Sequence, residues 1–484
     1  MSTFFGLNIS RLGLQTQQKS LTITSHNIAN ANTPGYSRQR ALLSTTNPLP
    51  YLNGEGMLGS GVKTAEISRV RDRFLDTQLR REAQTLAKWE TRHSFLSQVE
   101  DIFMEPSETG FSSVLNTFYN SWQELSLNPE SSSVRAALLE NGNAFTNAAR
   151  HTNEQLKAVR THMAEQITAK TEEVNTFAKQ LADLNRQIVS LTAQRNNPAD
   201  LLDRRDNLLK ELTEIIEFDT VLNDNSSISI FIAGRALVDN NLNFRITTIA
   251  GALDGDWTLS PQPVWERDNQ PLNMSNGQLA SLMETRDVLL RSYMEDFSSM
   301  VWGVINSVND LHSTGMDLYG TSGNAFFTGN EIETLQANDL LRNDSGLIAA
   351  SMAALPGHSQ PAPGDGGNAL LIARLRSAAI SVDPLQPDVR LRATLDSAGL
   401  TTFTNFHRDN IARLGVDTRE SERLAENQTS LIGMLRQRQD SIAGVSLDEE
   451  MANMIQFQLA YQASARMITA FDEIYDTLIN RMLR

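Results

Sequence analysis

The chain has no cysteine among its 484 residues, and this absence excludes several kinds of chemistry at once. Thiol catalysis, zinc–sulfur sites and disulfide bonds all need cysteine, so none of them contributes to this protein. A protein that reaches an oxidising exterior in an unfolded state also benefits from having no thiols to cross-link. The missing cysteines therefore leave secretion open as a route.

Aromatic residues are scarce as well, at 6% of the chain against 40% for hydrophobic residues as a whole. The interior must therefore be built mainly on Leu, Ile, Met and Ala, which favours packed helices over a thick β-sandwich. A chain of this length exceeds what one ordinary core supports, so we expect roughly two to four structural units.

Positive charge and long apolar runs are also lacking. The formal net charge is −15, so the chain offers no basic surface on which to gather the phosphates of a nucleic acid. No apolar run approaches the ~18 residues that a membrane-spanning helix needs, and the start of the chain lacks a cleaved secretory signal. We predict no nucleic-acid partner and no membrane insertion, and composition alone is typical of a cytosolic protein.

The usual signatures of catalysis and cofactor binding are missing too. The 7 histidines form no H-x-x-x-H or H-E-x-x-H pattern, and G-x-G-x-x-G at 54–59 lies between prolines and a strand-like segment. The carboxylates of Asp448, Glu449 and Glu450 are explained by the dipole of the helix that starts there. We predict no catalytic residue, no cofactor, no metal site and no enzymatic activity.

Both ends of the chain carry amphipathic helix patterns. At the start, apolar residues recur every seven positions over about 30 residues, and the pattern stops at a Pro-Gly pair suited to a type II turn. The apolar positions are Leu7, Leu14, Leu21 and Ile28, and the turn is Asn32, Thr33, Pro34, Gly35 and Tyr36.

The last helix is the clearest element of the sequence. Ser446 and Glu449 form an S-x-x-E capping box, and a heptad pattern interrupted only by Gln458 and Asp472 follows to the end of the chain. Its apolar positions are Leu447, Met451, Met454, Tyr461, Ala465, Ile468, Tyr475, Ile479 and Met482.

The middle of the chain mixes long helices with a β-rich unit. Helices are expected at about 72–103, 134–194, 199–217, 277–312, 368–377 and 391–443. Alternating β-branched segments such as SISIFIA and FRITTI predict strands within 218–272. A segment rich in Gly, Ser, Asn and Pro, about 313–369, is expected to be a variable or flexible surface segment.

The predicted fold is mainly α, with three domains in addition to the surface segment at 313–369. The terminal helices at 1–40 and 445–484 form a coiled-coil assembly domain. Residues 41–217, 273–312 and 370–444 form a long-helix bundle domain with short strands, into which a small β-rich domain at 218–272 is inserted. Because a solitary amphipathic helix leaves its apolar face in water, the two ends need partners: each other, and further copies. The alternative is an ordinary helical hairpin inside a monomer.

Particular residues give the chain a resemblance to a known family. The stretch SHNIANANTPGYSR at Ser25–Arg38 closely resembles the N-terminal signature of flagellar rod, hook and hook-associated proteins, and its NTPGYSR form is typical of the hook–filament junction family, hook-associated protein 1. Gly59–Leu79 resembles the segment that follows in that family. VSLDEEMANMIQFQLAYQASARMI at Val445–Ile468 resembles its C-terminal signature.

This resemblance implies a structural subunit that forms a ring of copies between hook and filament. It implies an inner coiled coil made by the terminal helices and export in an unfolded state by the flagellar type III apparatus. The implied partners are copies of the chain, the hook protein, the second hook–filament junction protein and a cytosolic export chaperone at the C-terminal helix. The implied location is the extracellular flagellum, with a cytoplasmic stage before export.

Other functions stay open at this point. The chain is alternatively another flagellar axial protein, such as hook, distal rod or hook cap. A secreted enzyme that degrades peptidoglycan is a second alternative, although no paired acid residues lie in a convincing loop. A soluble coiled-coil signalling protein is a third.

Overall fold

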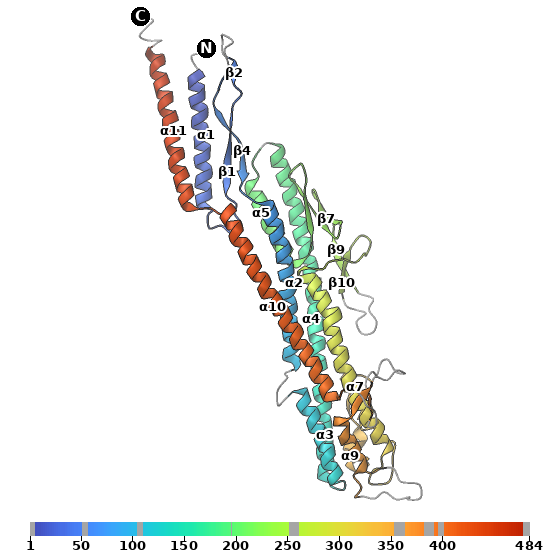
Figure 1. Ribbon diagram of the computed structural model, residues 1–484. Helices are drawn as coiled ribbons and strands as arrows, with labels where there is room; N and C mark the ends of the chain where they lie inside the picture. Colours follow the sequence, from blue (N-terminus) through green and yellow to red (C-terminus); the bar gives the residue numbers. More distant parts are fainter. Residues whose placement is uncertain are drawn as a thin grey trace.

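Long helices dominate the computed structural model, which describes residues 5–50, 57–103, 110–194, 196–250, 261–352, 364–381, 392–394 and 401–477. The molecule is an elongated rod whose helices run mostly along its length (Figure 1). Helices α1 (Phe5–Ala29) and α11 (Leu447–Asp476) lie together at one end, where both chain termini also lie. The predicted mainly α fold, with long helices at both ends of the chain, is confirmed.

The body of the rod is a bundle built around one very long helix. Helix α4 (Ser132–Ala193) has 62 residues, which corresponds to roughly 93 Å at 1.5 Å per residue. Helices α2 (Arg73–Phe103) and α10 (Phe403–Ala443) pack side by side along it. The other α-helices of the body are α3 (Phe111–Leu127), α5 (Ala199–Ile215), α6 (Gly277–Glu284), α7 (Arg291–Thr314), α8 (Asp339–Asn343) and α9 (Gly367–Arg374).

The β-structure falls into two main regions. Beside α1, β1 (Gln39–Thr45) pairs antiparallel with β4 (Val62–Arg69), and the short β2 (Leu49–Pro50) and β3 (Met57–Leu58) also pair. The second region lies within 218–272, where strands were expected. It contains β5 (Asp219–Leu222), β6 (Ile228–Ile232), β7 (Arg235–Asp239), β8 (Leu242–Asn243), β9 (Ile246–Ala250) and β10 (Pro261–Trp265).

Two asparagines of α4 attach this second β-region to the bundle. The Asn185 amide donates to the Ile228 carbonyl (2.7 Å), and its Oδ1 accepts from the Ile228 N–H (3.0 Å). Asn175 makes the same pair of bonds with Ile246, at 2.8 and 2.9 Å. Each buried side chain thus satisfies both backbone groups of a strand residue, as a neighbouring strand would.

A π-helical turn at Thr285–Leu290 joins α6 to α7 and holds a buried arginine under β10. The Arg286 guanidinium pairs with Asp287 (2.7 Å) and donates to the Pro261 carbonyl (2.9 Å). The turn therefore connects the helical bundle to the β-region through a satisfied buried charge.

The structure differs from expectation at 313–369 and at the start of α10. The Gly- and Asn-rich segment was expected to be a surface segment, yet Phe326 and Phe327 lie within the core, because two adjacent aromatic rings fill the space beside α3 and α4. β11 (Phe327–Thr328) and β12 (Gln336–Ala337) pair there. The prediction of helix from 391 is wrong at its start: β14 (Arg392–Thr394) pairs with β13 (Ala379–Ser381). Helix α10 begins at Phe403, where the Thr402 hydroxyl caps it.

The hydrophobic core is continuous through the body but does not extend to the terminal end. It runs from Phe95 to Leu414 and includes buried residues of both β6 and α7. Among the described residues, no member of α1, β1, β4 or α11 belongs to it. The terminal elements are therefore attached to the body by contacts of another kind.

A buried histidine in the far part of the body predicts acid sensitivity. The His312 Nδ1–H donates to the Asn324 carbonyl (2.8 Å), and its Nε2 accepts from the Ala349 N–H (3.1 Å), so the ring is neutral. Burial lowers the pKa of His312 from about 6.5 to about 4, against the smaller opposing effect of the Asn324 carbonyl. The unfolded chain therefore binds the proton first as pH falls, and stability decreases between about pH 6.5 and pH 4.

The expected loss across that range is roughly 3 kcal/mol of unfolding free energy. It can be measured by chemical denaturation of the wild type and of His312→Gln at a series of pH values. The variant should start less stable at pH 7 but should lose about 3 kcal/mol less on acidification than the wild type. Equal slopes in the two proteins would contradict this assignment.

Candidate functional site: the terminal coiled coil and its joint

Helices α1 and α11 form an antiparallel pair with a regular register. A side chain at Gly6 would collide with the Phe471 ring, and an added Cβ at Gly13 would lie 3.9 Å from the Cβ of Ser464. Further along, the Asn27 amide donates to Glu450 (3.0 Å). These contacts fall seven and fourteen residues apart on each helix, which are multiples of the repeat of a coiled coil.

The structure places the predicted assembly residues in two settings. Half-buried beside the α1–α11 contact are Leu7, Leu14, Leu21, Ile28, Met454, Tyr461, Ala465, Ile468 and Tyr475. Leu447 and Met451, by contrast, are exposed. Ile479 and Met482 lie outside the described residues. The contact itself is centred on residues that the heptad analysis did not select, namely Glu450, Ser464 and Phe471.

Helix α11 also exposes six large apolar residues to water, which we name the exposed ridge. Four of them, from Leu447 to Leu459, recur at four-residue steps, and each of the six is between 48% and 62% exposed. They are Leu447, Met451, Ile455, Leu459, Met467 and Ile474. Helix α11 therefore has one apolar side against α1 and another facing water.

The turn after α1 has the predicted geometry. Gly35 has a φ of 76°, as the third residue of a type II turn requires, and the Tyr36 N–H donates to the Thr33 carbonyl (3.1 Å). The turn directs the Tyr36 hydroxyl back onto α1, where it donates to Asn27 Oδ1 (2.7 Å) and accepts from His26 Nδ1 (3.0 Å). Pro34 is the second residue of this turn and Asn32 directly precedes it, so the family motif closes the end of α1.

A charged clasp connects the turn to the first turn of α11. Arg38 donates through Nε to Glu450 and through a terminal nitrogen to Glu449, both at 2.8 Å. Glu450 is 2% exposed, and within Leu447–Asp476 it is the only buried residue. The Ser446 hydroxyl accepts from the Glu449 N–H, so the predicted cap is present.

A second set of polar contacts links the terminal elements to α5. The Ser37 N–H donates to Asp203 (3.2 Å), and the Gln39 amide donates to Asp200 (3.1 Å). From the end of β4, Arg69 pairs with both Asp203 and Asp206 at 2.7 Å. We name this region, where the turn and the end of β4 meet α5 and the C-terminal end of α10, the joint.

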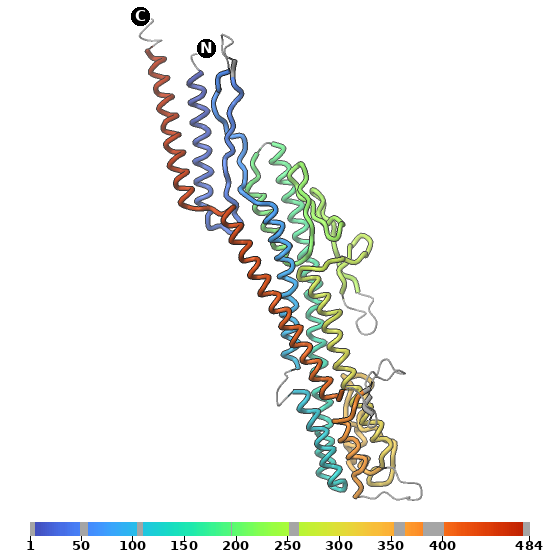
Figure 2. The backbone as a smooth tube through the Cα atoms, viewed as in Figure 1, coloured from blue at the N-terminus to red at the C-terminus, as the bar shows by residue number. Residues whose placement is uncertain are grey.

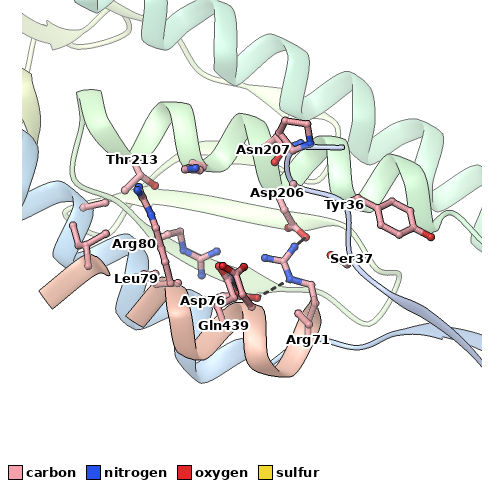
Figure 3. A pocket seen from close by; sticks show the side chains of 18 of the residues that line it. Tyr36, Ser37, Arg71, Asp76, Leu79, Arg80, Asp206, Asn207, Thr213 and Gln439 are labelled. Atoms are coloured by element: carbon pink, nitrogen blue, oxygen red, sulfur yellow. Dashed lines mark hydrogen bonds and ion pairs between the residues drawn. The ribbon is translucent and has the colours of Figure 1, made fainter. Parts of the chain in front are cut away.

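A cavity of about 600 Å³ lies at the joint. Figure 3 shows Arg71 facing Asp206 of α5, Arg80 extending toward Thr213, and Gln439 of α10 beside Asp76. Arg71 pairs with Asp206 and, at 3.0 Å, with Asp76. Charged side chains thus form part of the walls, unlike the apolar interior of the body.

The pKa values of three groups at the joint are shifted by burial and by nearby carboxylates. Burial lowers the pKa of Arg71, but the carboxylates of Asp206 and Asp76 outweigh this effect and raise it above its usual value. Burial lowers the pKa of Arg205 to about 10, which keeps it charged at pH 7. Burial and the nearby carboxylates raise the pKa of Tyr36, so its hydroxyl stays protonated. Arg71, Arg205 and Tyr36 therefore each keep one protonation state around neutral pH.

The described residues also bear on metal and membrane binding. In this part of the chain, no group of three His, Cys, Asp or Glu side chains is placed to hold a metal ion. No helix in the same ranges is long and apolar enough to cross a bilayer. Residues 54–56 of the G-x-G-x-x-G segment lie outside the described residues.

The chain is similar in sequence to known proteins over nearly its whole length. The chain is 30% identical to flagellar hook-associated protein 1 of Bacillus subtilis over 514 aligned residues, which cover 99% of each chain. The chain belongs to the flagellar hook-associated protein 1 family. The corresponding proteins of Escherichia coli and Salmonella typhimurium are 24% and 23% identical, each over 98% of this chain and 99% of the relative.

Family models and a solved structure support this membership. The model described as flagellar hook-associated protein FlgK helical domain matches 96–327. Models for the flagella basal body rod protein and the FlgEFG C-terminal region match 7–36 and 436–482. The flagellar hook junction protein FlgK from Burkholderia pseudomallei has a similar fold, with a TM-score of 0.64 at 14% identity over 76% of this chain and all of that one. This hook-associated protein is a structural subunit of the extracellular bacterial flagellum.

Sequence analysis did not identify the residues that build the joint. Asp203 and Asp206 lie in the middle of the chain, and their pairing with Arg69 depends on tertiary structure alone. Arg38 and Glu450 were inside the two terminal signatures, and their opposite charges were the available signal. The motif NTPGYSR extends beyond the turn to Arg38, and Arg38 forms the clasp with Glu449 and Glu450.

Proposed function

We propose that this chain is a non-enzymatic subunit of the hook–filament junction, and that it joins its neighbours through α1 and α11. The observation that carries the proposal is the exposed ridge on α11. A helix whose second side faces water permanently is normally polar on that side. Covering each ridge residue would contribute roughly 1.5–3 kcal/mol, so the ridge favours association with another molecule.

The first partner we propose is another copy of the chain. Helix α1 lies between α11 and the β1–β4 hairpin, so the hairpin and the ridge belong to different sides of the terminal unit. The hairpin also exposes Leu42, Leu43 and the nearby Met57 of β3. Two different apolar surfaces on one subunit support a head-to-tail contact, which generates a ring when the rotation between copies closes.

Further partners follow from the family. In the assembled flagellum these are the hook protein on one side and the second hook–filament junction protein on the other. Before export, a cytosolic chaperone would bind the C-terminal helix in the helix-in-groove mode, with residues of the exposed ridge as anchors. The absence of cysteine suits export of the unfolded chain by the flagellar type III apparatus.

We also propose which residues form each domain of the chain. Residues 1–40 and 445–484 form the assembly domain, and 41–217, 273–312 and 370–444 form the helical bundle that carries the β-rich 218–272. The bundle has its own core, which supports independent folding. Residues 313–369 belong to the outer part of the subunit.

Deleting 451–484 tests the proposed role. The truncated chain should remain soluble and retain the helical signal of the body, but it should fail to join filaments to hooks in cells that lack the intact protein. Motility and electron microscopy of released hooks measure the outcome, and circular dichroism of the purified chain is the control. Filaments attached to hooks by the truncated chain would contradict assembly through α11.

A further inference from the structure

On α1, the residues at the centre of the contact with α11 recur every seven positions. The α1 positions at the centre of the contact are Gly6, Gly13, Ser20 and Asn27, all small or polar. Opposite them, α11 presents Phe471, Ser464 and Glu450, and by the same spacing Phe457 faces Ser20. A small residue every seven positions lets the two backbones approach closely, because no large side chain separates them.

This packing does not by itself select one register. If α11 were displaced by one heptad, which is ~10.5 Å, Phe471 would face Gly13 and Ser464 would face Ser20. Both pairings set a small residue on α1 against the same kinds of residue as before. The half-buried leucines at Leu7, Leu14 and Leu21 also repeat at seven-residue steps, so they would find equivalent neighbours.

The end of the contact that lies near the joint is different, because it holds the buried charge of Glu450. Glu450 accepts from the Asn27 amide (3.0 Å) and from Arg38 (2.8 Å), and Asn27 is itself fixed by the Gln39 backbone and the Tyr36 hydroxyl. Any displacement by a heptad would remove Glu450 from all these donors. Buried polar residues in coiled coils are known to fix register in this way.

We propose that Glu450 sets the register of the terminal coiled coil by selecting this alignment over those displaced by one heptad. Asn27 and Arg38 are its partners and act through it. The inference deepens the proposed assembly role, since the register fixes the height at which each copy presents its exposed ridge to the next. A uniform height is what a closed ring of identical contacts requires.

The cysteine-free sequence allows a direct test by cross-linking. Gly13→Cys is combined in turn with Ser464→Cys, Phe471→Cys or Phe457→Cys in the full-length chain. The first pair reports the present register, because its Cβ separation of 3.9 Å lies within disulfide range. The other two pairs report displacement by one heptad in either direction. Oxidised monomers are then quantified on non-reducing gels.

Each pair is made in four backgrounds: wild type, Glu450→Leu, Glu450→Gln and Glu449→Leu. Glu449 is the matched control, because it also pairs with Arg38 but its side chain is 63% exposed. In the wild type and in Glu449→Leu, we expect only the Gly13–Ser464 pair to form in high yield. In Glu450→Leu, the yield of a displaced pair relative to the present one should rise at least about tenfold, since breaking a buried charge contact costs far more than that factor. Glu450→Gln should show a smaller increase in the same direction.

Two results would overturn the proposal. If both Glu450 variants retained the Gly13–Ser464 pair alone, register would be set elsewhere. If all three pairs were lost, Glu450 would be a stabilising residue and not one that selects register. Neither result depends on polymerisation, because the disulfide forms within one chain. A failure of hook–filament joining is therefore distinguishable from a failure of this inference.

Discussion

Replacing Ile455 and Leu459 by aspartate should abolish incorporation of this hook-associated protein while leaving α11 paired with α1. Both residues lie on the exposed ridge and not at the α1 contact, so the change adds two charges only where another molecule is expected. Burying an unpaired carboxylate costs at least several kcal/mol, and each lost apolar contact adds about 2 kcal/mol. We expect association to weaken by more than about a thousandfold.

The measurement is complementation of motility, together with secretion of the variant into the medium. Ile455→Asp alone is compared with Gln456→Asp, which introduces the same charge one residue further along at an exposed polar position. The Gln456 variant should assemble. The Gly13–Ser464 cross-link within the aspartate variants shows whether α1 and α11 remain together. Normal filament attachment by the double variant would exclude the ridge from the interface.

The largest loss of stability should come from Arg135→Met in the body. This residue is 1% exposed and lies near the start of α4. Its guanidinium donates to the carbonyls of Pro129 (2.7 Å), Ser345 (3.1 Å) and Ile348 (2.8 Å), and it approaches that of Gly346. It therefore attaches the loop at 344–348 to two segments of the bundle.

Methionine fills a similar volume but leaves these buried carbonyls without donors. At about 1–3 kcal/mol for each unsatisfied group, less the cost of burying the charge itself, we expect a net loss of roughly 3–5 kcal/mol. Arg186→Met, in the same helix but with a 65% exposed side chain, should change stability by less than about 0.5 kcal/mol. Thermal unfolding followed by circular dichroism compares the two. Equal melting temperatures would contradict this role of Arg135.

The terminal helices and the turn were predictable because local signals agree there. The seven-residue spacing, the Pro-Gly pair and the capping serine each reflect a backbone requirement that is independent of distant residues. The side of α11 that meets α1 was not predictable, because α11 has apolar residues on both sides. Periodicity of large residues cannot detect a contact centred on Gly6 and Gly13.

In the body, the features that sequence analysis missed depend on tertiary contacts. Helix α3 received no separate prediction, although Phe111, Leu115, Phe118 and Trp122 recur at helical spacing and are buried. Its serines and asparagines have low helix propensity, and aromatic packing against α4 outweighs them. In the sequence, Asp203 and Asp206 look like ordinary helix-surface residues. Their role depends on Arg69 at the end of β4, which pairs with both.

The end of the hydrophobic core before the joint has a mechanical consequence. The smooth trace in Figure 2 changes direction where α10 meets α11, and the chain enters the terminal unit only near there and through the link between β4 and α2. A bending load on the terminal unit therefore falls on Arg69 and Arg71, whose ion pairs with α5 can break and re-form in water. The rod can flex at one place without wetting its interior.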